Sequence, residues 1–232
     1  MIRFRRNSAR TRQTTQRLAA GVFLALCICY STALAAHTEI REFNARIDNK
    51  PAGSYTMSIV EGKEGRAVMT AEASVSVRMY LVKTYTYSYS GTETWKAGRL
   101  QELKSKANDD GKALGVVAWA TVDGLMVWAG GKQRPTKGDA WTTTYWRLPD
   151  PALRNGLIHL LDADTGKDLY GTLQLIDWQE LNVAGQKQKC SHYRLTGEKL
   201  NVELWYDASE RLVREKLVED GHTLVLELAG IR

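Results

Sequence analysis

Cysteine is scarce in this chain, which has three among 232 residues. Cys27 and Cys29 fall in a hydrophobic run near the N-terminus, so the remainder of the chain keeps Cys190 alone. A single thiol excludes an internal disulfide and a zinc site made of several cysteines. The fold must therefore be stable on its apolar core, and pairing of Cys190 with another chain stays open.

Acidic residues are absent before Glu39, and the formal charge of +6 comes entirely from the first 17 residues. The basic residues there are Arg3, Arg5, Arg6, Arg10, Arg12 and Arg17. An apolar run over residues 18–34 follows, with Ala33 and Ala35 at the spacing of a cleavage site. The sequence predicts a secretory signal peptide over residues 1–35, cleaved near Ala35 after Sec-type export to the periplasm or beyond. Retention of the run as an anchor is the alternative.

The chain from residue 36 onward carries no net formal charge, since basic and acidic residues balance there. Nucleic-acid binding needs a basic face, so we expect no nucleic-acid partner. We also expect no stable membrane span after cleavage. Residues 36–232 have the length of one domain with a sizeable core, and no linker or repeat divides them.

Residues 84–95 alternate strictly between two kinds of side chain. Threonines and serines occupy the even positions, while Tyr85, Tyr87, Tyr89 and Trp95 occupy odd ones. This period of two predicts a strand with one polar and one apolar face. The propensities of the residues agree with the pattern.

Similar alternation recurs along the chain, separated by turn pairs such as Asp110-Gly111 and Ala184-Gly185. We predict an all-β, mainly antiparallel fold: a single curved or barrel-like meander of about a dozen strands. Residues 151–161 differ, because Pro151 follows Asp150 and leucines recur at helical spacing. They predict one short helix packed on the sheet.

Aromatic residues are abundant in the predicted domain and suggest a binding face. The candidate ligand-binding residues are Tyr85, Tyr87, Tyr89, Trp95, Trp119 and Trp128. Their rings could line a pocket for an apolar or lipid-like molecule, with hydroxyl and indole groups as polar handles. The alternative is ordinary packing in the core of the sheet.

Motifs for catalysis or metal binding are weak. Cys190 and His192 lack an orienting third group. The stretch from Asp162 to Asp168 resembles the start of a calcium loop, but Gly166 and Leu173 stand where ligands belong. Its Asp-Thr-Gly tripeptide is better explained as a turn. No histidine spacing or cofactor fingerprint is present, so we predict no catalytic residue, metal or cofactor.

Several stretches together resemble a family of exported bacterial proteins catalogued as a domain of unknown function. They are Glu93-x-Trp95-x-x-Gly98-x-Leu100, Asp109-Asp110-Gly111, Thr144-Tyr145-Trp146 and Trp205-Tyr206-Asp207. The resemblance runs from about Phe43 to Leu228 and implies an export signal and a β-meander, with no family reaction to transfer. At the level of architecture, the chain is also similar to the curved-sheet carriers of lipoproteins.

The favoured interpretation is a non-enzymatic periplasmic binding module for a hydrophobic small molecule or lipid. One alternative is an envelope protein that binds another protein through a strand edge. The other is a hydrolase that uses carboxylates at the rim, with Asp109, Asp110 and Asp207 as candidates. Turn chemistry accounts for these three residues more simply.

Overall fold

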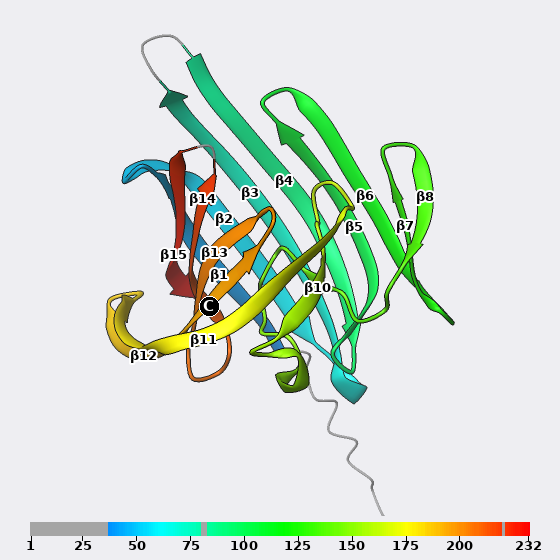
Figure 1. Ribbon diagram of the computed structural model, residues 1–232. Helices are drawn as coiled ribbons and strands as arrows, with labels where there is room; N and C mark the ends of the chain where they lie inside the picture. Colours follow the sequence, from blue (N-terminus) through cyan, green and yellow to red (C-terminus); the bar gives the residue numbers. More distant parts are fainter. Residues whose placement is uncertain (1–36, 80–82, 220) are drawn as a thin grey trace, which may run out of the picture. The chain divides into compact units, whose positions relative to one another are not determined.

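The computed structural model describes residues 37–79, 83–219 and 221–232, so the predicted signal peptide lies outside the described residues. These residues form one sheet of fifteen strands (Figure 1). The strands are β1 (His37–Ile47), β2 (Lys50–Glu61), β3 (Arg66–Met79), β4 (Lys83–Lys96), β5 (Arg99–Asp109), β6 (Lys112–Thr121), β7 (Gly124–Ala129), β8 (Lys132–Thr136), β9 (Trp141–Thr142), β10 (Leu157–Leu161), β11 (Asp168–Val183), β12 (Gln186–Gly197), β13 (Leu200–Tyr206), β14 (Leu212–Glu219) and β15 (His222–Ile231).

The order of the strands shows two meanders joined through the chain's first and last strands. Strands β8 to β1 follow one another on one side, and β15 to β9 on the other, with β1 paired to β15. All neighbours are antiparallel except β9 and β10, which are parallel. We call β1–β8 the first half of the sheet and β9–β15 the second half. The predicted all-β, antiparallel meander is confirmed.

The predicted turn pairs adopt the backbone that hairpins need. Asp110 and Gly111 have φ of 47° and 92°, and Ala184 and Gly185 have φ of 50° and 82°. Two consecutive positive φ values match the twist of a two-residue antiparallel connection. These pairs therefore fix the β5–β6 and β11–β12 hairpins and the register that follows from them.

The predicted helix over residues 151–161 is wrong. Asp150 does cap a 3-10 turn, η2 (Pro151–Leu153), by accepting a hydrogen bond from the Ala152 amide at 2.9 Å. The chain then turns through Asn155, at φ 60°, and continues as β10. Because β10 pairs with both β9 and β11, its backbone groups are satisfied between strands. Its Leu160 and Leu161 are buried in the core, whereas Leu157 is 71 % exposed. The two 3-10 turns, η2 and η1 (Lys63–Gly65), are the helical elements of the described residues, and none is long or apolar enough to span a membrane.

The sheet curls until β8 meets the turn between β10 and β11. Arg134 of β8 donates to Asp168 and to the Gly166 carbonyl, both at 2.6 Å, and Thr136 donates to Asp168 at 2.7 Å. Gly166 packs on the first half so closely that a Cβ there would lie 2.7 Å from the Ala129 Cβ. Side-chain and glycine contacts, rather than a backbone ladder, thus join the two halves at this seam.

The seam predicts a stability difference between two glycines with similar backbones. Gly166 and Gly185 both have positive φ, but a Cβ at Gly185 meets nothing within 4 Å. Gly185→Ala is expected to cost about 1 kcal/mol from backbone strain alone. Gly166→Ala is expected to cost about 1 to 3 kcal/mol more, because the methyl group overpacks the seam. Urea unfolding of both variants checks this, and equal losses would contradict a tightly packed seam.

Candidate functional site

A loop from the second half crosses the interior and is held there by one buried carboxylate. We call residues 141–148 the interior loop; it begins with the two residues of β9. Glu93 of β4 accepts hydrogen bonds at Oε2 from the indoles of Trp95 (2.7 Å) and Trp146 (3.1 Å) and from the Thr142 hydroxyl (3.1 Å). Its Oε1 accepts from the Thr144 hydroxyl at 2.7 Å. Three of the four donors belong to the interior loop, so Glu93 ties that loop to the wall of the sheet.

Glu93 is removed from water, but protein groups donate hydrogen bonds to both of its carboxyl oxygens. Burial raises the pKa of Glu93, and the four donated hydrogen bonds oppose that rise. The Arg147 guanidinium lies 5.8 Å from the centre of the Trp95 ring and 5.2 Å from that of the Trp146 ring. A cation therefore contacts the two indoles that donate to Glu93. A carboxylate that satisfies four donors stabilises the loop in one position.

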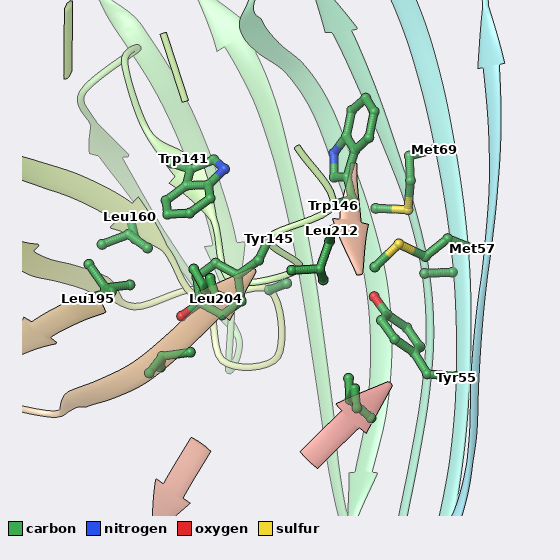
Figure 2. Packing of buried hydrophobic residues seen from close by; sticks show 14 of the residues in the cluster. Tyr55, Met57, Met69, Trp141, Tyr145, Trp146, Leu160, Leu195, Leu204 and Leu212 are labelled. Carbon is green, nitrogen blue, oxygen red and sulfur yellow. The ribbon is translucent and has the colours of Figure 1, made fainter. Parts of the chain in front are cut away.

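Two further bonds hold the backbone of the interior loop. Arg41 of β1 donates to the Trp146 carbonyl at 2.7 Å, and the Tyr206 hydroxyl of β13 donates to the Tyr145 carbonyl at 2.9 Å. Tyr145 has φ of 49°, an unusual backbone for an aromatic residue. Figure 2 shows Tyr145 and Trp146 among Met57 and Met69 of the first half and Leu204 and Leu212 of the second.

Beyond the interior loop an open cavity of about 760 Å³ lies between the two halves. Residues 143–145 form part of its wall, and β2, β3 and β4 face β13, β14 and β15 across it. Apolar side chains cover much of the lining, among them Ala73, Val75, Leu114, Leu200, Leu217 and Leu226. Five tyrosines also line it: Tyr55, Tyr85, Tyr87, Tyr89 and Tyr145.

Three of these tyrosines follow one another on β4 at alternate positions. The Tyr85 hydroxyl donates to Asp109 at 2.9 Å, and the Tyr87 hydroxyl donates to Asp164 at 2.8 Å. The Tyr89 hydroxyl has no hydrogen-bond partner among the described residues, although the side chain is 6 % exposed. Its ring folds over Gly91, where a Cβ would lie 2.2 Å from the hydroxyl oxygen. Burial and neighbouring carboxylates raise the pKa of all three, so the hydroxyls stay protonated as hydrogen-bond donors.

Two carboxyl groups of the lining have strongly perturbed pKa values. Burial raises the pKa of Asp164 to about 6, against the hydrogen bond from Tyr87, which lowers it. Burial alone raises the pKa of Glu215 to about 8. Glu215 is 9 % exposed, and because burial is the sole influence on its pKa, no described residue forms a hydrogen bond or ion pair with its carboxyl group. At neutral pH Glu215 is therefore mostly a neutral acid that faces the cavity without a partner.

The structure separates the six aromatic residues that the sequence grouped together. Tyr85, Tyr87 and Tyr89 line the cavity, and Trp95 shares their face of β4 but binds Glu93 instead. The expectation that Trp119 and Trp128 lie with them is wrong, because both point outward and are 37 % and 45 % exposed.

Strand register explains the placement of these two indoles. Ser105 of β5 pairs with Val116 of β6, and Leu103 pairs with Ala118. All four are buried, so the inward positions of β6 are the even ones there. Trp119 falls on the odd, outward face, and Trp128 pairs with the outward Val117.

Sequence reasoning missed Glu93, Asp164 and Glu215 as members of a site. A signal for Glu215 is present, because it occupies the same strand face as Val213 and Leu217, where an apolar residue is expected. Glu93 likewise stands at the odd, apolar positions of residues 84–95. An acid within an apolar stripe indicates a buried polar group with a structural or binding role.

The other candidate groups have local structural roles. Asp162 accepts from the Asp164 amide and the Thr165 hydroxyl, at 2.9 Å and 2.6 Å, in the turn predicted from the Asp-Thr-Gly tripeptide. Asp207 pairs with Arg211 at 2.7 Å. Burial raises the pKa of Cys190, which makes its thiol a poor nucleophile. The described residues hold no group of three or more acidic, histidine or cysteine side chains placed to bind a metal.

Comparison with known proteins places this architecture in a family. The family model described as Domain of unknown function (DUF6134) matches residues 43–229. The chain belongs to this family. No curated protein matches. Among solved structures, a beta-barrel-like protein of Domain of Unknown Function DUF1849 from Brucella abortus superposes with a TM-score of 0.62 at 10 % identity. The match covers 84 % of this chain and 96 % of that one, and it shows that the fold is barrel-like.

The convergence of four donors predicts that this DUF6134 domain depends on the Glu93 charge. Glu93→Gln replaces one acceptor oxygen by an amide that faces donors, and is expected to lower the free energy of unfolding by about 3 kcal/mol or more. Glu102→Gln is the control, because Glu102 forms an exposed ion pair with Lys104; it should cost less than about 0.5 kcal/mol. Denaturant unfolding followed by tryptophan fluorescence measures both, and similar losses would refute the prediction.

Glu215 predicts a pH dependence of stability. The unfolded chain releases this proton near the usual pKa of 4.5, whereas the native state keeps it to about pH 8. The native state therefore binds more protons between these values, and stability falls as pH rises. Relative to Glu215→Gln, the wild type should lose up to about 5 kcal/mol across this window and level off above it. The exposed Glu72→Gln serves as control, and a pH-independent difference for Glu215→Gln would contradict the buried, unpartnered acid.

Proposed function

We propose that this protein is a non-enzymatic binding module that holds a small amphipathic molecule in the cavity between the two halves of its sheet. The observation that carries the proposal is the cavity of about 760 Å³ with Glu215 in its lining, a buried acid that has no hydrogen-bond or ion-pair partner among the described residues. Ligand pockets commonly measure roughly 300 to 1,000 Å³. They combine apolar walls with a few polar groups that orient the ligand.

The chemistry of the lining favours binding over catalysis. The tyrosine hydroxyls keep their protons because their pKa values are raised, so they are not nucleophiles. Asp109 and Asp164 already accept bonds from Tyr85 and Tyr87. The described part of the lining thus supplies an apolar surface with a few polar side chains, which can position a guest, and no nucleophile activated to attack it.

The place of action belongs to the same proposal. The basic first 17 residues and the apolar run that follows support export, with cleavage near Ala35. A domain stable without disulfides is compatible with transport of the unfolded chain followed by folding in the periplasm. There the module would sequester or carry a hydrophobic or lipid-like molecule.

Filling the cavity tests the proposal. Ala73 of β3 lines the cavity, whereas Ser76 of the same strand is exposed. Protein purified from its natural host without detergent should yield a small molecule on extraction with organic solvent, identified by mass spectrometry. Ala73→Trp should reduce the recovered amount at least about fivefold because the indole occupies the ligand's volume. The Ser76→Trp variant should yield as much of the extracted molecule as the wild type.

The extraction from the wild type and the comparison of the two tryptophan variants can each contradict the proposed binding cavity. Absence of any extracted molecule, together with no binding of added amphiphiles, would refute it. Equal recovery from Ala73→Trp and Ser76→Trp, with both variants folded by circular dichroism, would show that the extracted molecule binds elsewhere.

A further inference from the structure

We propose that the ligand of this cavity is an organic cation, with its apolar body among the aliphatic side chains and its positive charge beside Glu215 and the tyrosine rings. The inference rests on the proposed binding function and names the class of ligand. The argument begins with the charges of the lining. It includes six acidic residues, Asp109, Asp162, Asp164, Glu198, Glu215 and Glu219, and one basic residue, Lys199. Such a surface favours positive guests and repels negative ones.

Glu215 is the observation that points to an occupant. Its side chain is more than nine-tenths buried and lines the cavity, yet no described residue compensates the group. Asp109, Asp162 and Asp164, by contrast, already accept hydrogen bonds within the protein. A buried acid without a partner is costly to keep, and a cation placed beside it would supply the missing counter-charge.

The tyrosines supply a second, independent form of cation recognition. Tyr55, Tyr87 and Tyr89 lie on β2 and β4, and Tyr145 lies on the interior loop, so rings from several directions line one space. Aromatic faces attract ammonium groups, most strongly where water is excluded, and sites for quaternary ammonium groups are typically built from several rings.

Proton linkage follows from the same placement. The titratable groups that interact with Glu215 are Tyr55 of β2, Tyr145 of the interior loop and Tyr206 of β13, each with its pKa raised by burial and by this carboxyl group. None of the three carries a charge at neutral pH. A cation beside Glu215 lowers the pKa of that acid from about 8, so binding at pH 7 should release a proton. A neutral guest should release none.

The experiment compares three probes that share a decyl chain: decyltrimethylammonium, 1-decanol and decyl sulfate, each below its micelle concentration. Isothermal titration calorimetry at pH 7, in two buffers of different ionisation enthalpy, gives affinity and proton release. The wild type should bind the ammonium probe about tenfold or more tightly than decanol and should release protons only with the ammonium probe. Decyl sulfate should bind most weakly.

Two variants with the same substitution of glutamate by glutamine locate the effect. Glu215→Gln should weaken binding of the ammonium probe about tenfold and abolish proton release. The affinity for decanol should stay unchanged. Glu72→Gln alters an exposed residue of β3 outside the cavity and should change neither the affinity for the ammonium probe nor the proton release. Thermal melts confirm that both variants are folded. If Glu215→Gln were unfolded, proton release by the wild type would still decide the question.

The outcomes separate this inference from the function on which it rests. Equal or tighter binding of decanol or decyl sulfate, or ammonium binding that Glu215→Gln does not weaken, would overturn the cation inference while a binding cavity stands. Failure of all three probes to bind would refute the binding function itself. Ammonium binding weakened equally by both variants would show nonspecific attraction to surface acids and would also overturn the inference.

Discussion

The interior of this protein depends on one buried carboxylate with four hydrogen-bond donors. Glu93 is an expensive residue to bury, and it is tolerated because two indoles and two hydroxyls converge on it. Trp95 comes from the same strand, while the other three donors come from residues 142–146. This single acid thus connects the long strands of the first half to a short segment of the second. Arg41 and Tyr206 bind two carbonyl groups of the interior loop, and Glu93 binds three of its side chains.

The position of that loop divides the inside of the curled sheet into two regions. On one side Trp141 and Trp146 pack with methionines and leucines into a closed core (Figure 2). On the other side residues 143–145 form a wall of the open cavity. The tyrosines of β4 extend into the open region, and Glu215 approaches it from β14. A continuous alternation along β4 therefore serves both regions, with Glu93 and Trp95 in the packed core and Tyr85 to Tyr89 in the cavity.

Sequence patterns predicted those features that depend on local geometry. The period of two over residues 84–95 correctly placed Tyr85, Tyr87, Tyr89 and Trp95 on one face, because strand sidedness is a property of the backbone. Turn pairs located hairpins for the same reason. The helix over residues 151–161 and the inward placement of Trp119 and Trp128 were wrong because the pairing and register of each strand with its neighbours decide both. The partners of Glu93 lie about 50 residues away, at Thr142, Thr144 and Trp146, and local patterns hold no information about such contacts.

The most direct test of the central claim is hydrogen exchange at the tryptophan indoles, followed by NMR. If Glu93 holds the interior loop as described, the indole protons of Trp95 and Trp146 are protected and exchange only when the whole domain unfolds, as slowly as the amides of β3 and β4. The exposed indoles of Trp119 and Trp128 provide the fast reference in the same sample. Exchange of Trp146 at the rate of that reference would contradict the account, since the loop would then leave Glu93 without unfolding of the sheet.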